Sequence, residues 1–119
     1  METIVRYIGK NRGKSRIWIE GKALARFGWT KGTSYVQANF SYAPPYRNWI
    51  DLVKGNKQSD VGGSFLLKKK SKVTEKRIAG TIDRPIIDLC GNYVAKLFKG
   101  YKTVQIHITT NSIEIEGNE

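Results

Sequence analysis

The amino-acid sequence predicts a mostly β domain with two short helices, built as a barrel or sandwich of two strand-helix-hairpin units. Three observations support this fold class. The length of 119 residues suits a single domain spanning residues 1–119. The apolar fraction of 39% provides enough side-chain volume for one packed core. The chain also matches itself without gaps when it is shifted by 70 residues.

The internal match predicts two repeat units, of about residues 15–54 and 84–116, joined by a basic linker or hairpin of residues 55–83. Residues 17–27 lie over residues 87–97. The matched pairs include Gly21 with Gly91, Ala25 with Ala95 and, further on, Val36 with Ile106. A single unit cannot bury its apolar face alone. We therefore expect the two units to pack on each other about a pseudo-twofold axis.

Each unit begins with a strand that ends in alternating apolar residues, Ile17 and Ile19 in the first unit, before a glycine breaks it. A short helix follows, because Leu24 and Phe27 are three residues apart and share one face. A glycine-bearing turn then leads into a hairpin. The hairpin strands of the first unit are expected at residues 34–40 and 49–53.

The second unit repeats this order and contains the clearest strand pattern of the chain. Within residues 102–110, Val104, Ile106 and Ile108 alternate with polar residues, so they are expected to face the core together. Residues 111–112 predict the turn into a last short strand.

Positive charge is the feature that bears most directly on a partner. The chain carries 21 Lys and Arg against 10 Asp and Glu, a formal net charge of +11. Two clusters stand out, at residues 10–16 and at residues 68–77. Lysine and arginine neutralise phosphates and release condensed counterions, so such clusters indicate a nucleic-acid footprint. A solvated face that only confers solubility is the alternative interpretation.

The segment SRIWIEGKAL (residues 15–24), followed by residues 27–33, resembles the AbrB/MazE-type swapped-hairpin domain, especially its SymE branch. In that family a strand, a glycine, a leucine-bearing short helix, an aromatic-containing turn and a Gly-Thr pair lead into a strand. Residues 84–89 with Gly91 are similar to the strand start of the same branch. The two-unit arrangement is also similar to N-terminal regions of phage DNA cytosine methyltransferases. The resemblance implies a DNA-binding β fold in which two halves interlock, here within one chain.

The resemblance further implies that basic residues before the strand and near the helix reach DNA. These residues are Arg16, Lys22 and Arg26 in the first half, and Arg84 and Lys96 in the second. Together with the two charge clusters they give the predicted nucleic-acid-binding set: Lys10, Arg12, Lys14, Arg16, Lys22, Arg26, Lys68, Lys69, Lys70, Lys72, Lys76, Arg77, Arg84 and Lys96.

The aromatic residues divide into a core group and a surface group. Phe27, Trp29 and Tyr35 belong to the repeated framework and are expected in the core. Trp18 alternates with two apolar neighbours, so it is expected to face outward as a subunit contact or a base-stacking platform. The predicted base-stacking or partner-binding set is Trp18, Tyr42, Tyr46, Arg47 and Trp49. Aromatic residues mixed with arginine suit unpaired bases and protein partners equally well.

The sequence shows no constellation typical of an enzyme, a metal site or a cofactor site. His107 is expected on the polar face of a strand and Cys90 at a strand–helix turn, and one histidine with one cysteine cannot supply a structural zinc site. No apolar run approaches the ~20 residues of a membrane span. The N-terminus lacks the pattern of a signal peptide, so a cytoplasmic location is expected.

The sequence therefore predicts a non-enzymatic nucleic-acid-binding protein, with duplex DNA favoured, of the transcription-regulator or DNA-packaging type. The alternative is a phage-type protein–protein inhibitor or anti-defence factor that uses the aromatic loop Tyr42–Trp49. A single-stranded nucleic-acid binder that uses the same loop is a third hypothesis. No cofactor, metal or membrane partner is expected, and both a monomer and a homodimer are compatible with the sequence.

Overall fold

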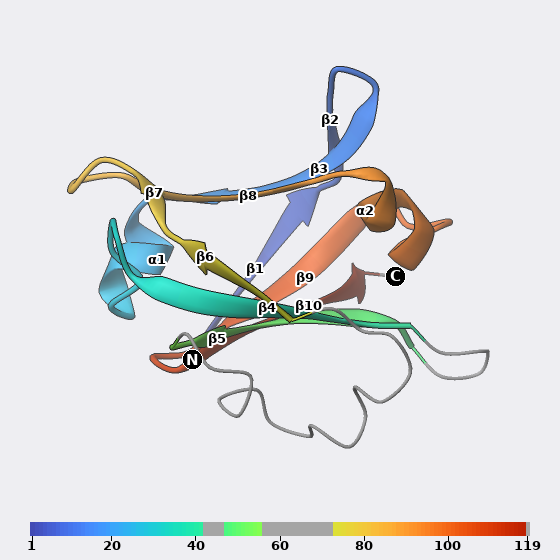
Figure 1. Cartoon of the computed structure of the whole chain (residues 1–119). Coiled ribbons are helices and arrows are strands. Elements are labelled where there is room, and N and C mark those ends of the chain that lie inside the picture. Colours follow the sequence, from blue (N-terminus) through green and yellow to red (C-terminus); the bar gives the residue numbers. More distant parts are fainter. Residues whose placement is uncertain (42–46, 56–72, 119) are drawn as a thin grey trace.

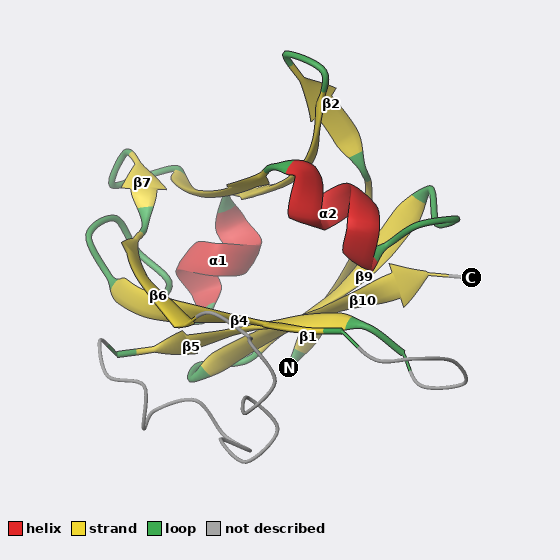
Figure 2. Ribbon diagram, turned by 45° about the vertical axis from the view of Figure 1, so that its right-hand side comes forward, coloured by secondary structure: helices red, strands yellow, loops and turns green. Residues whose placement is uncertain are grey.

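The computed structural model describes residues 1–41, 47–55 and 73–118. Within these ranges the chain is mostly β with two short helices, as the sequence predicts. Two antiparallel sheets face each other, and the helices lie between them at opposite ends (Figure 1). Figure 2 shows the same two layers from a second direction. In this part of the chain no helix is long and apolar enough to cross a membrane.

The larger sheet contains six of the described strands, each antiparallel to its neighbours. In order across the sheet they are β1 (Glu2–Tyr7), β9 (Thr103–Ile108), β10 (Ser112–Asn118), β5 (Trp49–Lys54), β4 (Ser34–Phe40) and β6 (Val73–Arg77). The smaller sheet contains β2 (Gly9–Asn11), β3 (Lys14–Glu20), β8 (Pro85–Cys90) and β7 (Ala79–Gly80) in that order. The helices are α1 (Lys22–Arg26) and α2 (Asn92–Leu97).

The strand order has the same pattern when it is followed from either edge. In the larger sheet β1 and β6 form the edges, β9 and β4 lie next to them, and β10 pairs with β5 in the middle. In the smaller sheet β3 pairs with β8 in the middle, with Trp18 opposite Asp88. Each half of the chain thus supplies one edge strand and one hairpin to the larger sheet, one hairpin to the smaller sheet, and one helix. A pseudo-twofold axis would produce this arrangement, and the axis itself stays a prediction.

Two isoleucines, 70 residues apart, mark the places where the chain passes from the larger sheet to the smaller one. Ile8 lies between β1 and β2, and its backbone amide donates a hydrogen bond to the carbonyl oxygen of Lys102 at 2.9 Å. Ile78 lies between β6 and β7, and its amide donates to the carbonyl oxygen of Thr33 at 3.0 Å. The expected linker of residues 55–83 therefore includes strands of both sheets.

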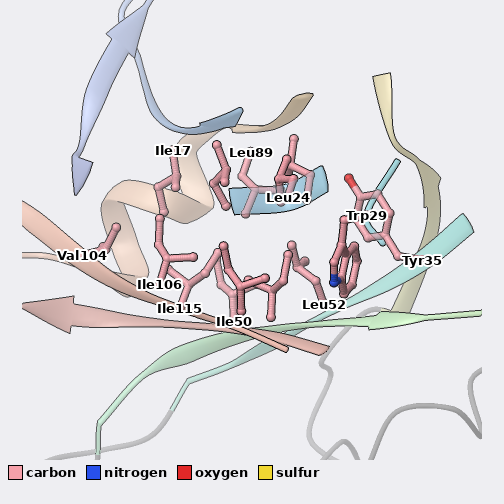
Figure 3. Close-up of a cluster of buried hydrophobic side chains, with 14 of the residues drawn as sticks. Ile17, Leu24, Trp29, Tyr35, Ile50, Leu52, Leu89, Val104, Ile106 and Ile115 are labelled. Atoms are coloured by element: carbon pink, nitrogen blue, oxygen red, sulfur yellow. The ribbon is translucent and has the colours of Figure 1, made fainter. Parts of the chain in front are cut away.

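The main core lies between the two sheets (Figure 3). Side chains from both sheets meet there, among them Ile17, Leu89, Ile106 and Ile115. Trp29 is fully buried, and its indole Nε1 donates a hydrogen bond to the carbonyl oxygen of Thr109 at 2.8 Å. Tyr35 is buried and Phe27 packs half-buried against the cluster. The core positions predicted for these aromatic residues are therefore confirmed.

In the β4–β5 and β9–β10 hairpins, residues that are 70 positions apart do not occupy equivalent places. The offset pairs Val36 with Ile106, but Val36 packs with Phe40 in a separate cluster whereas Ile106 lies in the main core. The register places Gln37 opposite the core residue Leu52, so Gln37 occupies the inward position. Because side chains alternate along a strand, a shift of one residue moves the pattern to the other face.

Candidate nucleic-acid interface

The β2–β3 hairpin projects from the smaller sheet (Figures 1 and 2). Asn11 pairs with Lys14 across the hairpin, which leaves Arg12 and Gly13 as a two-residue loop. Both loop residues have positive φ, 53° and 79°, as a type I′ turn requires. This turn matches the twist of the flanking strands, so the ribbon stays regular up to its tip. Lys10, Arg12 and Lys14 are exposed along it.

A groove of about 510 Å³ lies at the base of this hairpin, between the β1–β2 corner and the turn that follows α2. One wall consists of Tyr7, Ile8, Lys10 and Ser15. The other wall consists of Ala95, Phe98, Lys99, Gly100, Tyr101 and Lys102. Three of the lining residues are lysines and none is acidic. The groove therefore presents positive charge and suits an anionic ligand.

Apolar anchors position the lysines of the second wall. Phe98 is buried directly after α2. Gly100 has a φ of 89°, which a glycine adopts without strain, and the chain then turns so that the amide of Tyr101 donates to the carbonyl oxygen of Phe98 at 3.0 Å. Lys99 and Lys102 stand on either side of this anchored turn, and both are exposed.

The two walls of the groove are fixed by contacts within the protein. A Cβ atom on Gly117 of β10 would lie 2.7 Å from the ring of Tyr101, so the ring occupies the space that a larger residue would need. The hydrogen bond from the amide of Ile8 to the carbonyl oxygen of Lys102 joins one wall to the other. The shape of the groove is therefore set before any ligand binds.

The three groove lysines are available to a ligand. Within residues 1–41, 47–55 and 73–118, Lys10, Lys99 and Lys102 form no ion pair with an acidic side chain. A lysine that is not already paired can neutralise a ligand's phosphate without first losing a carboxylate partner.

Arg16 is placed differently from the hairpin cations. Its guanidinium donates hydrogen bonds to both carboxylate oxygens of Asp88, at 2.9 and 3.0 Å, and lies 4.4 Å from the centre of the Trp18 ring. The hydrogen bonds to Asp88 raise the pKa of Arg16. Trp18 is half-buried and faces away from the core, as its alternation predicts. Arg16 must release Asp88 before it can contact a phosphate.

None of the other described cations of the predicted set lines the groove, and they differ in whether their charged group forms a hydrogen bond. Three of these cations, Lys22, Arg84 and Lys96, are exposed, and their charged groups form no hydrogen bond within the described residues. Arg26 donates a hydrogen bond to the carboxylate of Glu2 at 2.7 Å. Arg77 donates one to the carbonyl oxygen of Gly32 at 3.2 Å.

Lys76 belongs to a polar network between β4, β6 and α2. Its Nζ donates a hydrogen bond to Oε1 of Gln37 at 2.6 Å, and Nε2 of Gln37 donates to the hydroxyl of Tyr93 at 3.2 Å and to Oδ1 of Asn39 at 3.0 Å. Gln37 is only 4% exposed, and burial lowers the pKa of Lys76. Lys76 therefore links parts of the protein to one another, a role that its place in a basic cluster did not predict.

Several predicted residues lie outside the described ranges, and their roles stay predictions. They are Lys68, Lys69, Lys70, Lys72, Tyr42 and Tyr46. The two described members of the predicted aromatic and arginine set in this loop, Arg47 and Trp49, contact neighbouring strands. Arg47 donates a hydrogen bond to the carboxylate of Glu116 at 2.8 Å, and Trp49 stacks on Phe40 with ring centres 4.6 Å apart.

The sequence-based set contains only Lys10 among the lining residues of the groove, and it omitted Tyr7, Lys99, Tyr101 and Lys102. A signal for the two lysines was present, because the segment Lys99-Gly100-Tyr101-Lys102 combines two cations with a turn residue and an aromatic. Tyr7 ends an alternating strand near the N-terminus and carried no such signal.

His107 and Cys90 lie outside the groove. Nδ1 of His107 lies 3.0 Å from Oγ1 of Thr3, and Nε2 lies 3.5 Å from the carboxylate of Glu116. Cys90 is half-buried at the end of β8. In the part of the chain that the structure describes, no group of three or more His, Cys, Asp or Glu residues could hold a metal ion.

A scan against protein-family models, a search of curated proteins and a search of solved structures each find no match to this chain.

Proposed function

We propose that this chain is a non-enzymatic nucleic-acid-binding protein that holds duplex DNA through the β2–β3 hairpin and the groove at its base. The observation that carries the proposal is the projecting hairpin with Lys10, Arg12 and Lys14 exposed along it, next to the lysine-lined groove. Regulation of transcription or packaging of DNA in the cytoplasm is the role that such binding would serve.

The dimensions of a two-stranded ribbon favour duplex DNA as the ligand. The major groove of B-DNA is about 12 Å wide and admits a two-stranded β-ribbon. The helices α1 and α2 have five and six residues and lie between the sheets, so neither can act as a recognition helix. The hairpin is therefore the element best suited to enter the major groove, while Lys99 and Lys102 contact the phosphates beside it.

The backbone of Arg12 supports a role for its side chain in binding. Arg12 is the only non-glycine residue with positive φ in the described part of the chain, at 53°. A left-handed conformation costs a non-glycine residue roughly 1–2 kcal/mol, and asparagine or glycine is the usual choice in this turn. An arginine kept at the tip despite this cost suits a direct contact, for example two hydrogen bonds to a guanine edge.

Base reading, which the sequence leaves to Arg16, Arg26 or Arg84, is accordingly proposed for Arg12 instead. Arg84 lies outside the β2–β3 hairpin and does not line the groove. Arg16 and Arg26 donate to carboxylates, Asp88 and Glu2, and would exchange an existing ion pair for a contact with DNA. Arg12 has no carboxylate partner in the described ranges, so its contact with DNA requires no such exchange.

Fluorescence anisotropy with a blunt duplex of ~20 base pairs, two helical turns, tests the proposal. We expect duplex binding at about 50 mM salt that weakens steeply up to about 200 mM. Because five cations lie on the hairpin and in the groove, namely Lys10, Arg12, Lys14, Lys99 and Lys102, the slope of log K against log salt should be about −3 to −5. Absence of binding at the lowest salt, or a slope near zero, contradicts the proposal.

A further inference from the structure

We propose that the groove binds an unpaired nucleotide next to the duplex, with its base stacked against Tyr7. This inference rests on the proposed function, since it assigns the groove a part of the same DNA ligand. The preferred substrate is then a duplex that carries a single-stranded extension, rather than a blunt duplex.

The aromatic lining of the groove is the observation that points to a base. Tyr7 is 80% exposed at the end of β1, and Tyr101 lies half-buried in the opposite wall. A tyrosine hydroxyl can donate a hydrogen bond to a phosphate, so the comparison of Tyr7→Phe with Tyr7→Ala separates that contact from stacking of the ring. A planar aromatic ring, in contrast, stacks on any base whose face is free.

Base pairing determines which nucleotides offer such a face. In a duplex each base is covered by its neighbours above and below, so an interior base cannot stack on a protein side chain unless it leaves the helix. An unpaired nucleotide beyond the end of the duplex has no such cost. Its phosphates are then within the reach of the same lysines that line the groove, Lys99 and Lys102.

The groove lies where a ligand with a paired part on the hairpin and an unpaired part beside it would place the unpaired nucleotide. Lys10 belongs both to the hairpin strand β2 and to the groove wall, so the two surfaces are continuous. A duplex that is bound with its end at the base of the hairpin places its single-stranded extension at the groove. The contacts of Ile8 with Lys102 and of Tyr101 with Gly117 hold the walls in place, which reduces the ordering that binding of a flexible strand would otherwise require.

Anisotropy with two probes tests the inference: a blunt duplex, and the same duplex with a single-stranded extension of a few nucleotides. The wild-type protein should bind the extended duplex at least about fivefold more tightly, the lower limit for one stacked base. Tyr7→Ala should lose this preference, measured as the ratio of the two dissociation constants, whereas Tyr7→Phe should keep it. Ile82→Ala is the matched control, because Ile82 is 83% exposed and does not line the groove.

The outcomes separate this inference from the proposed function. Equal affinity of the wild-type protein for the two probes, or a preference that persists in Tyr7→Ala, overturns the inference and leaves duplex binding intact. Binding to neither probe overturns both. Thermal unfolding of Tyr7→Ala at the wild-type temperature shows that a lost preference does not come from a lost fold.

Discussion

The β2–β3 and β7–β8 hairpins occupy corresponding places in the two halves of the chain but carry different charge. Each has a two-residue loop, Arg12-Gly13 in the first and Ile82-Asp83 in the second, since Asn11 pairs with Lys14 and Thr81 exchanges backbone hydrogen bonds of 3.0 and 3.2 Å with Arg84. Residues 9–15 contain three cations and no acid, a charge of +3. Residues 79–85 contain one of each, a charge of zero.

The same strand pairing is therefore compatible with a charged hairpin in one half and an uncharged hairpin in the other. The registers place Gly80 at the position that corresponds to Lys10, and Pro85 at the position that corresponds to Ser15. Gly80 has a φ of 91°, and a Cβ there would collide with the carbonyl oxygen of Arg84. The second hairpin therefore cannot carry a cation at this point, although its strand pairing is the same.

The largest expected effect on stability comes from placing a cation in the uncharged β7–β8 hairpin. Gly80→Lys should lower the free energy of unfolding by about 2–4 kcal/mol, because it adds a strained φ and a backbone collision. The reverse change, Lys10→Gly, should lower the free energy of unfolding by about 1 kcal/mol or less. Urea unfolding of both variants checks this prediction. A Gly80→Lys variant as stable as the wild-type protein would show that the backbone does not set the asymmetry.

The inward positions of β4 and β9 give a second contrast, between Gln37 and Ile106. Gln37→Ile should make the first half apolar like the second, but it leaves Nζ of Lys76 and the hydroxyl of Tyr93 without their hydrogen-bond partner. We expect a loss of about 2 kcal/mol in unfolding free energy. Gln37→Glu retains the acceptor for Lys76 and should stay closer to the wild-type stability. Equal stability of Gln37→Ile and wild type would contradict the structural role of the network.

Asp51 and Glu114 face each other across the central strand pair of the larger sheet, and they differ in burial. Burial, with a smaller contribution from Glu114, raises the pKa of Asp51 from 3.8 to about 6. The folded protein therefore binds a proton more readily than the unfolded chain, and it loses stability as the pH rises through this window. Asp51→Asn should raise the free energy of unfolding by about 1 kcal/mol at pH 7. This is less than the full pKa shift of Asp51 would give, because the carboxyl is partly hydrated.

Thermal or urea unfolding of Asp51→Asn at several pH values gives the check. The gain over the wild-type protein should disappear as the pH falls below about 4, where Asp51 is protonated in both the folded and the unfolded state. Glu114→Gln, at the exposed member of the pair, should show a smaller gain. A difference between Asp51→Asn and wild type that stays constant with pH would exclude the buried carboxyl as its cause.

The smallest expected effect on stability lies at the hairpin tip. Arg12→Asn should raise the unfolding free energy by about 0.5–1 kcal/mol, because asparagine accepts positive φ at lower cost. The same variant should bind the blunt duplex more weakly, by roughly fivefold for one lost base contact. Calorimetry and anisotropy on one sample measure both quantities. A more stable variant with unchanged affinity would remove Arg12 from the interface.

The parts of the fold that follow from local patterns were predictable from the sequence. The alternation over residues 102–110 places Val104, Ile106 and Ile108 in the core, where the structure has them. The helix spacing and the outward position of Trp18 follow equally from neighbours in the chain. The face of β4 was not predictable in this way, since a one-residue shift in the match reverses every side chain.

The groove depends on contacts between the two ends of the chain, which no local pattern contains. Tyr7 and Lys10 come from the first strands, and Lys99 and Lys102 come from the turn after α2. Pairing of β1 with β9 brings them together. Likewise, the ion pair between Arg16 and Asp88 arises only because β3 lies beside β8, so the sequence could not show that Arg16 is engaged.

Duplex binding by two triple variants, one at the β2–β3 hairpin and one at exposed cations elsewhere, tests the central claim most directly. Lys10→Gln/Arg12→Gln/Lys14→Gln neutralises the charged hairpin, and Lys22→Gln/Lys31→Gln/Arg84→Gln removes the same charge from exposed residues outside the hairpin and the groove. At about 0.1 M salt the first variant should lose roughly 30-fold in affinity, with a salt slope shallower by about 2–3. The second should change less than about threefold. Equal losses in the two variants would contradict the account, because they would mean that net charge, rather than the hairpin, binds DNA.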